Sequence, residues 1–387
     1  MKTKLWSLTL GNFAIGTGAL IVPGMLNELS ADLAVTPAAI GVVISAFAMT
    51  ICVGGPFLAG WTSALERRVL LTAALLLYAV MHILAACAPG YLSLMAIRVV
   101  TAIGAALFTA QAAATAGLLV PAEQRGKAIG LVFLGWSIAA VVGMPVGAYL
   151  GAHIGWRLTI ALVGGLSALF ALWVWLQIPA RLFVPAMDKA AWKSLYANKP
   201  LLLAISVTAI QGVGQFTLFS YIAAVLKEFI QAGPTTISVL FACFGVTGVI
   251  GNLLASRFMD RLGTTQVGLY AMGCMCLAQI FWPLTRDSLG ITTLLMLLWG
   301  LGCFALNGVQ QARLVEMAPA LAPASVSLNS SAIYLGQALG ALTGGAMISA
   351  GHLAQLSIVG AVLLALAMLV SQFAARMSRR IGVGELA

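Results

Sequence analysis

The chain consists of long apolar blocks separated by short segments that hold most of its charged residues. A helix needs about 20 apolar residues to cross the hydrocarbon core of a bilayer, so each block predicts one spanning helix. Short alternating segments, which the strands of a membrane barrel would show, do not occur in the sequence, and the predicted fold class is an all-α membrane protein. Twelve spans are predicted, at residues 5–27, 38–59, 69–88, 92–119, 128–151, 158–178, 200–229, 236–256, 265–284, 290–314, 325–348 and 355–375.

Composition and charge agree with this pattern and orient it. Hydrophobic residues make up 61% of the 387 positions and charged residues only 8%, which is too few to cover a water-soluble surface. With an even number of spans and a cytoplasmic N-terminus, 16 of the 20 lysines and arginines fall in cytoplasmic segments. Arg157, Lys227 and Arg286 fall on the outer side, and Arg98 lies inside a span. The positive-inside rule then places both termini in the cytoplasm. The net charge of +10 reflects topology and contact with anionic lipid, so no nucleic-acid partner is expected.

The sequence divides into two similar halves. We expect a six-helix bundle at 1–179, a central cytoplasmic loop at 180–199 and a second six-helix bundle at 200–387. A shift of about 197 residues aligns Gly104 with Gly302, and the pair Gly143 and Gly147 with the pair Gly340 and Gly344. Parallel half-repeats of this kind are typical of two-bundle transporters, although glycines can also match by chance in apolar sequence.

Several kinds of chemistry are not supported by the sequence. No phosphate-binding loop of the type Gly-x-x-x-x-Gly-Lys-Ser/Thr occurs, and all ten acidic residues lie in predicted loops or at span ends. The six cysteines fall inside predicted spans without the spacing of a zinc or redox motif. A clustered nucleophile and base cannot be assembled, so we expect no enzyme activity, no metal site and no cofactor.

Arg98 is the exception, because it lies six residues inside the predicted fourth span. Its side chain could snorkel toward the outer headgroups, which a long stem permits. Alternatively, it could face a hydrated cavity between the halves, where it would attract a solute or change partners during transport. A charge inside a membrane is a functional-site hypothesis by default, and the sequence favours the second interpretation.

Amide side chains concentrate on four of the predicted spans. Gln211 and Gln215 are four residues apart on the seventh span, and Asn307 and Gln311 repeat that spacing on the tenth, so each pair shares a helix face. Such amides can hold helices together or line a cavity. The predicted substrate cavity comprises Asn12, Arg98, Gln111, Gln211, Gln215, Asn307, Gln311 and Tyr334, the last in a stripe with Ser330 and Gln337.

The turn between the eighth and ninth spans carries a short charged motif. Arg257, Asp260 and Arg261 precede Gly263 in "SRFMDRLGTT". The carboxylate could accept hydrogen bonds from a helix N-terminus or an arginine and form a latch at the cytoplasmic face, or the turn could simply be solvated.

These motifs resemble those of the major facilitator superfamily, in particular the drug:proton antiporter branch that includes arabinose-type and purine efflux permeases. The segment Ser256 to Gly263 is similar to the family's charged turn, with Ser256 in place of its first glycine. The first-half copy, "AGWTSALERR", keeps Arg67 and Arg68 but has Ser63 where the family has aspartate. "RVVTAIG" at 98–104 resembles the fourth-span motif, and "GWSIAAVVGMPVGAYLG" at 135–151 resembles the fifth-span signature of antiporters.

The resemblance implies a cavity lined by spans one, four, seven and ten, a link between Arg98 and proton coupling, and a cytoplasmic gate at Arg67, Arg68, Arg257, Asp260 and Arg261. His82, on the third span, is then better explained as a packed or lipid-edge residue than as a proton carrier. One departure concerns the carboxylate that such antiporters commonly carry in the first span, which is missing here. Glu28 and Asp32, nearer the outer mouth, could substitute for it, or coupling could be weak or absent.

The predicted function is therefore secondary active transport in a bacterial inner membrane, with export of a small polar or amphipathic molecule by alternating access and probable exchange for protons. A drug, a sugar or a nucleobase would all suit cavity amides. The alternatives are an uncoupled facilitator or an importer on the same fold and, less favoured, a channel or receptor. The expected partners are the small-molecule substrate, protons and the lipid bilayer, and we expect a monomer.

Overall fold

The computed structural model describes residues 2–62, 64–121, 124–183 and 189–384. Within these ranges, eleven helices are long and apolar enough to cross a membrane. The remaining predicted span corresponds to α13 (Thr264–Ile280), which has 17 residues and continues into a 3-10 turn at Trp282–Thr285. Seventeen residues lie at the short end of the range for spanning helices, so all twelve predicted spans have a helical counterpart.

The N-terminal half contains eight α-helices in its described part. They are α1 (Lys2–Gly24), α2 (Leu26–Asp32), α3 (Pro37–Trp61), α4 (Arg67–Ala86), α5 (Tyr91–Leu118), α6 (Arg125–Ile138), α7 (Met144–His153) and α8 (Trp156–Gln177). The short α2 follows the first span, and α6 and α7 form one span joined by a π-helical turn at Ala139–Gly143. Pro145 has no backbone N–H to continue the helical ladder, which explains a local irregularity at this point.

The C-terminal half adds a helix before its first span. Its described helices are α9 (Lys189–Ala197), α10 (Lys199–Phe219), α11 (Ile222–Ile230), α12 (Pro234–Leu262), α13, α14 (Leu289–Met317), α15 (Ala322–Ser349) and α16 (Leu356–Gly384). The predicted span at 200–229 is divided between α10 and α11. The division lies at Tyr221, whose buried hydroxyl donates to the carbonyl oxygen of Ala341 at 2.6 Å.

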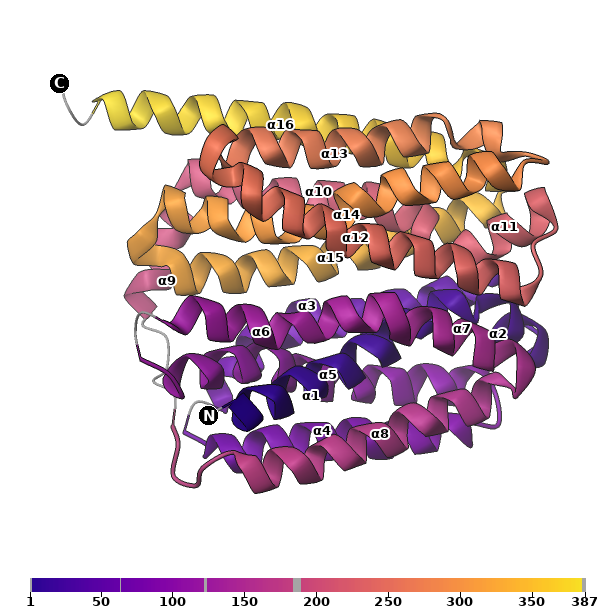
Figure 1. Ribbon diagram of the computed structural model, residues 1–387, viewed down its shortest axis with the longest axis horizontal. Coiled ribbons are helices and arrows are strands. Elements are labelled where there is room, and N and C mark those ends of the chain that lie inside the picture. Colours follow the sequence, from indigo (N-terminus) through magenta and orange to yellow (C-terminus); the bar gives the residue numbers. More distant parts are fainter. Residues whose placement is uncertain (1, 63, 122–123, 184–188, 385–387) are drawn as a thin grey trace. The chain divides into compact units, whose positions relative to one another are not determined.

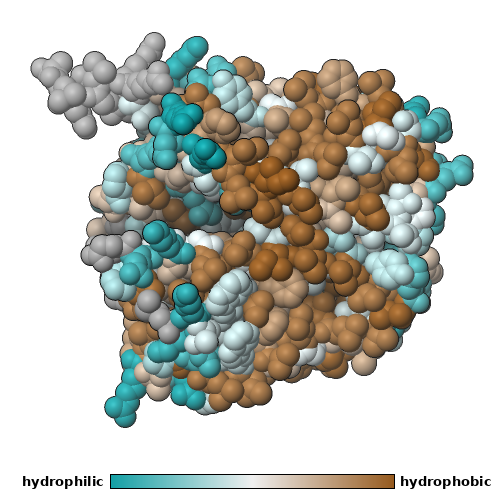
Figure 2. All heavy atoms as spheres, in the orientation of Figure 1, coloured by the Kyte–Doolittle hydropathy of each residue, from teal (hydrophilic) through white to brown (hydrophobic). Residues whose placement is uncertain are grey.

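The chain forms two compact units. The first contains the described residues up to 183 together with Ile222–Leu226 and Ala232–Ala242, and the second contains residues 189–221, Lys227–Gln231 and 243–384. In each unit the long helices lie side by side along a common direction (Figure 1). On the visible face, apolar residues cover the middle of these helices and hydrophilic residues gather at the helix ends (Figure 2), as contact with a bilayer requires.

Glycines allow the spans of the first unit to approach closely. A Cβ on Gly143 or Gly147 of the fifth span would collide with Thr17 or Ile21 of α1. In the second unit, a Cβ on Gly340 or Gly344 of α15 would collide with α10 in the same manner, at the side chain of Phe216 and the carbonyl oxygen of Thr217. The two glycine pairs that repeat in the sequence therefore have the same role, each packing against the first span of its unit.

A second pair of glycines supports the half-repeat. A Cβ on Gly104 of α5 would lie 2.9 Å from the carbonyl oxygen of Ala74 on α4, and one on Gly302 of α14 would collide with the carbonyl oxygen of Ala271 on α13. The glycines are 198 residues apart and the alanines 197, which matches the shift found in the sequence. The repeat thus reflects equivalent helix contacts and does not arise from chance matching of glycines.

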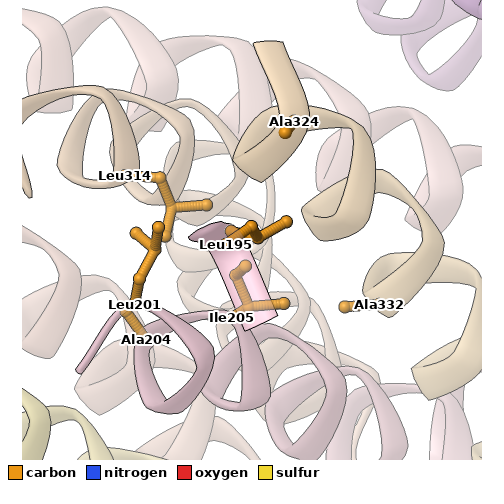
Figure 3. Packing of buried hydrophobic residues seen from close by; sticks show 7 residues of the cluster. All are labelled: Leu195, Leu201, Ala204, Ile205, Leu314, Ala324 and Ala332. Carbon is orange, nitrogen blue, oxygen red and sulfur yellow. The ribbon is translucent and has the colours of Figure 1, made fainter. Parts of the chain in front are cut away.

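The helix α9, which lies within the segment predicted as a central loop, packs into the second unit. Its Leu195 is fully buried and belongs to one apolar cluster with Leu201 and Ile205 of α10, Leu314 of α14 and Ala332 of α15 (Figure 3). The opposite side of α9 is exposed at Lys193 and Tyr196. The short helix is therefore amphipathic, with its apolar side covering one end of three spans.

We predict that Gly104→Ala destabilises the protein. The added methyl group would lie 2.9 Å from a backbone oxygen, so α4 and α5 must separate, at a cost of about 1–3 kcal/mol. The matched control is Gly165→Ala on α8, where a Cβ has no neighbour within 4 Å. The measurement is the midpoint of thermal unfolding in detergent, which should fall for the first variant only; equal midpoints would contradict the proposed close contact.

Candidate functional site

Arg98 lies inside the first unit. Its side chain is only 3% exposed, and Nη2 donates to the carbonyl oxygen of Gly18 on α1 at 3.1 Å. The guanidinium carbon lies 4.5 Å from the ring centroid of Phe47 on α3, a cation–π geometry. A snorkelling side chain would be exposed, so the lipid-facing interpretation of Arg98 is wrong.

Tyr78 and His82, both on α4, lie against the same residue, Gly18 of α1. Their rings are 4.2 Å apart, and the hydroxyl of Tyr78 donates to the carbonyl oxygen of Ile15 at 2.9 Å. A Cβ on Gly18 would collide with the Tyr78 hydroxyl and would lie 2.5 Å from Nε2 of His82. Only a glycine at this position lets α1 present its carbonyl to Arg98 with both rings in place.

Two residues assigned to different roles in the sequence are in direct contact. Arg67, predicted for the gate, is 1% exposed, and its Nη1 donates to Oε1 of Gln111, predicted for the cavity, at 2.9 Å. The backbone N–H of Arg67 also donates to the carbonyl oxygen of Leu182. The adjacent Arg68 lies 3.9 Å over the ring of Trp175 on α8. This arrangement ties α4 to α5 and α8.

Asn12 is also held inside the first unit. It is fully buried on α1, and its Nδ2 donates to the carbonyl oxygen of Val132 on α6 at 3.1 Å. Its position therefore supports the interpretation of this amide as a link between helices at least as well as a role in substrate binding.

The second unit contains a polar network that the sequence interpretation missed. The hydroxyl of Thr208 on α10 donates to Oδ1 of Asn329 on α15 at 2.6 Å. Nε2 of Gln310 on α14 donates to this hydroxyl at 3.2 Å and to the carbonyl oxygen of Ala204 at 3.1 Å. All three side chains are buried. The sequence pattern predicted the adjacent Gln311 instead, and neighbouring positions differ by about 100° around a helix.

The predicted amides of the second unit fall into two groups. Gln211 and Gln215 are buried on α10, and Nε2 of Gln215 donates to Sγ of Cys303 at 2.8 Å. Oε1 of Gln211 has no hydrogen-bond partner among the described residues. Asn307, Gln311 and Tyr334 are half-buried and make no side-chain hydrogen bond within the described ranges.

Asp32 at the end of α2 forms an ion pair with Arg157 and accepts a hydrogen bond from Nε1 of Trp156 at 3.0 Å. Arg157 also donates to the carbonyl oxygen of Ala88, so the pair connects α2, the α4–α5 loop and α8. The hydrogen bond from Arg157 is the main reason why the pKa of Asp32 is lowered from its ordinary value, followed by the bond from Trp156. An ionised carboxyl of this kind is poorly suited to binding protons near neutral pH. Glu28, the other carboxylate predicted for coupling, lies on the same helix and is half-buried.

The charged residues predicted for a turn form the exposed C-terminal end of α12. Arg257, Asp260 and Arg261 form no ion pair with other residues in the described part of the chain. Gly263 ends the turn with a φ of +78°, a conformation that glycine adopts without strain. The gate role of these residues stays a prediction, and Ser63 in the first-half turn lies outside the described residues.

Comparison with known proteins places this architecture in a family. A family model described as Major Facilitator Superfamily matches residues 8–341 and, in a second match, residues 207–380. The chain belongs to the major facilitator superfamily. Relatives of this chain in the family are named as transporters, so family membership supports transport and not enzyme activity.

Two relatives extend over almost the whole chain. The Escherichia coli K12 protein named "Inner membrane transport protein YdhP" is 31% identical over 376 residues, which is 96% of each chain. A Helicobacter pylori protein named "Probable sugar efflux transporter" is 26% identical over 373 residues, 96% of this chain and 94% of the relative.

Solved structures of similar fold include two other transporters. A bacterial homologue of the human lysosomal transporter Spinster has a TM-score of 0.80 and 19% identity, with 97% of both chains covered. The D-xylose–proton symporter has a TM-score of 0.79 and 17% identity, with 95% of this chain and 96% of the symporter covered. At these identities the likeness establishes the fold of this superfamily member, namely the twelve-helix architecture predicted from the sequence.

For Asp32→Asn we predict no change in the pH dependence of transport between about pH 5.5 and pH 8, because the lowered pKa keeps this carboxyl ionised throughout that range. A carboxyl whose pKa falls on folding adds stability above its unfolded pKa and loses it as the pH falls through the folded pKa. The variant should therefore lose thermal stability near neutral pH and differ less from the wild type in acid. A shifted pH profile of transport would instead identify Asp32 as a coupling residue.

Proposed function

We propose that this superfamily member exports a small hydroxylated solute of the sugar class across a bacterial inner membrane, in exchange for protons, by alternating access of its two halves. The names of the two full-length relatives support the membrane and the direction, and the Helicobacter relative supports the substrate class. The proton partner is supported by the buried guanidinium of Arg98 in the fourth-span motif.

The proposal rests on two buried side-chain atoms of the second unit, one hydrogen-bond acceptor and one donor. Oε1 of Gln211 and Nδ2 of Asn329 are buried without partners among the described residues. Asn329 is bonded to Thr208, which lies one helical turn before Gln211 on α10. A buried polar atom without a partner is destabilising, by about 1–3 kcal/mol.

A hydroxyl group can bond to atoms of both kinds, because it donates one hydrogen bond and accepts others. A polyol or sugar would therefore satisfy the acceptor on Gln211 and the donor on Asn329 together. A lipophilic cation offers no acceptor for the Asn329 amide, so this pair favours a hydroxylated solute over a cationic drug.

The test begins with a thermal-shift screen of purified protein against sugars such as L-arabinose, D-xylose and lactose, with nucleobases and cationic dyes in parallel. We expect stabilisation by at least one sugar. Stabilisation by dyes alone, with none by sugars, would contradict the proposed substrate class.

Gln211→Leu and Asn329→Leu should each weaken binding of the stabilising sugar by about 5- to 30-fold, the effect of about 1–2 kcal/mol from one lost hydrogen bond. The matched control is Gln372→Leu, the same change at an exposed position of α16. Affinity is measured by titration of the thermal shift. Equal affinity in all variants would place the binding groups elsewhere.

A further inference from the structure

The imidazole ring of His82 has an unused, fully buried nitrogen. The side chain is 0% exposed, and Nδ1 lies 2.8 Å from the carbonyl oxygen of Tyr78 one turn earlier on α4. A carbonyl oxygen can only accept, so Nδ1 carries the hydrogen and Nε2 presents a lone pair. This Nε2 has no hydrogen-bond partner in the described part of the structure. Packing explains the burial of the ring but not a basic nitrogen left without a donor.

The groups that face this nitrogen include one permanent charge. From α1, Gly18 approaches Nε2 so closely that a Cβ would lie 2.5 Å away, and its carbonyl oxygen holds Nη2 of Arg98. From α4 the neighbour is the ring of Tyr78, and Gly164 of α8, which brings no charge, lies against Cβ of His82. Arg98 of α5 acts on the ring electrostatically. No carboxylate among the described residues takes part in these contacts.

The position of His82 within the chain is also unusual. The ten acidic residues all lie in predicted loops or at span ends, and the other two histidines, His153 and His352, are exposed at helix ends. Among the described side chains in the hydrocarbon region of the first unit, His82 thus carries the group whose ordinary pKa in water lies nearest neutral pH.

We propose that His82 is a proton-binding site, and that a proton on Nε2 and the guanidinium of Arg98 exclude one another at Gly18. A proton turns Nε2 into a donor that needs an acceptor, and the carbonyl oxygen of Gly18, the α1 residue against which Nε2 lies, already accepts from Arg98. Protonation would also place a second positive charge beside the first without a carboxylate to neutralise either. Binding of the proton therefore requires Arg98 to leave Gly18, and release of the proton lets it return.

Through this exclusion, protonation of His82 would change the packing of α1 against α5. The bond from Arg98 to Gly18 joins α5 to α1, and α1 is the span that packs against the glycines of the fifth span. Loss of the bond would free α1 from α5 at one point while those other contacts persist. The inference rests on the proton exchange of the proposed function, and it replaces the missing first-span carboxylate with a histidine on the third span.

The site can be tested without a transport substrate, by NMR of full-length protein in lipid nanodiscs with ring-labelled histidine. The chain has three histidines, so the His82 signals can be assigned from their loss in His82→Gln. Arg98→Gln removes the charge but keeps an amide donor for Gly18, and Arg98→Lys keeps the charge. We expect the ring to titrate at least about one pH unit higher in Arg98→Gln than in the wild type, and to shift less in Arg98→Lys.

Arg157→Gln is the matched control, because it removes an exposed arginine of the same unit. It should leave the His82 titration unchanged. Equal titration of His82 in the wild type, Arg98→Gln and Arg98→Lys would overturn the proposed exclusion, whatever the protein transports.

The coupling role is tested in everted membrane vesicles with radiolabelled L-arabinose as the probe. In His82→Gln, accumulation driven by an imposed pH gradient should fall about ten-fold or more, while exchange of internal for external arabinose changes less than about two-fold. A purely structural role would reduce both activities together, which would contradict the proposal. Absence of arabinose transport in the wild type would count against the proposed substrate class but not against the NMR result.

Discussion

Close approach of helices at glycine is the constraint on which both units depend. Lipid tails are as apolar as leucine side chains, so spanning helices associate through close packing and interhelical hydrogen bonds rather than through hydrophobic burial. In the first unit, α1 packs against Gly143 and Gly147. In the second unit, α10 packs against Gly340 and Gly344 of α15. Repetition of the same contacts at a shift of about 197 residues explains why the two halves of the sequence look alike.

The close approach has a second consequence, because it brings backbone carbonyl oxygens within reach of side chains on the next helix. Asn12, Tyr78, Arg98, Tyr221 and Gln310 each donate to a carbonyl oxygen of a neighbouring helix. A carbonyl oxygen has two lone pairs and uses one in its own helix, so it can accept a second bond without breaking the ladder. The units thereby hold polar and even charged side chains inside, although the acidic residues lie in loops or at span ends.

The sequence predicted the spans well because their signal, about 20 apolar residues between charged turns, does not depend on tertiary contacts. It also identified Arg98, since a charge in an apolar block stands out. The partners of each polar residue could not be predicted in the same way. Whether Gln310 or Gln311 enters the network depends on the rotation of α14, and the bond between Arg67 and Gln111 joins residues 44 positions apart. The lone pair on Nε2 of His82 could not be predicted either, because it follows from the bond between Nδ1 and Tyr78, which determines the nitrogen that carries the hydrogen.

The charges of the two exchanged species determine which gradients drive the proposed exchange. A sugar carries no charge, so its export against one proton moves one net positive charge inward. An inside-negative membrane potential then drives the cycle with about 2.3 kcal/mol per 100 mV, in addition to the pH gradient. A carboxylate partner would become neutral on binding the proton, whereas His82 beside Arg98 becomes a second cation. In the proposed site the proton would act by repulsion, and movement of Arg98 away from Gly18 would convert the proton's free energy into a change in helix packing.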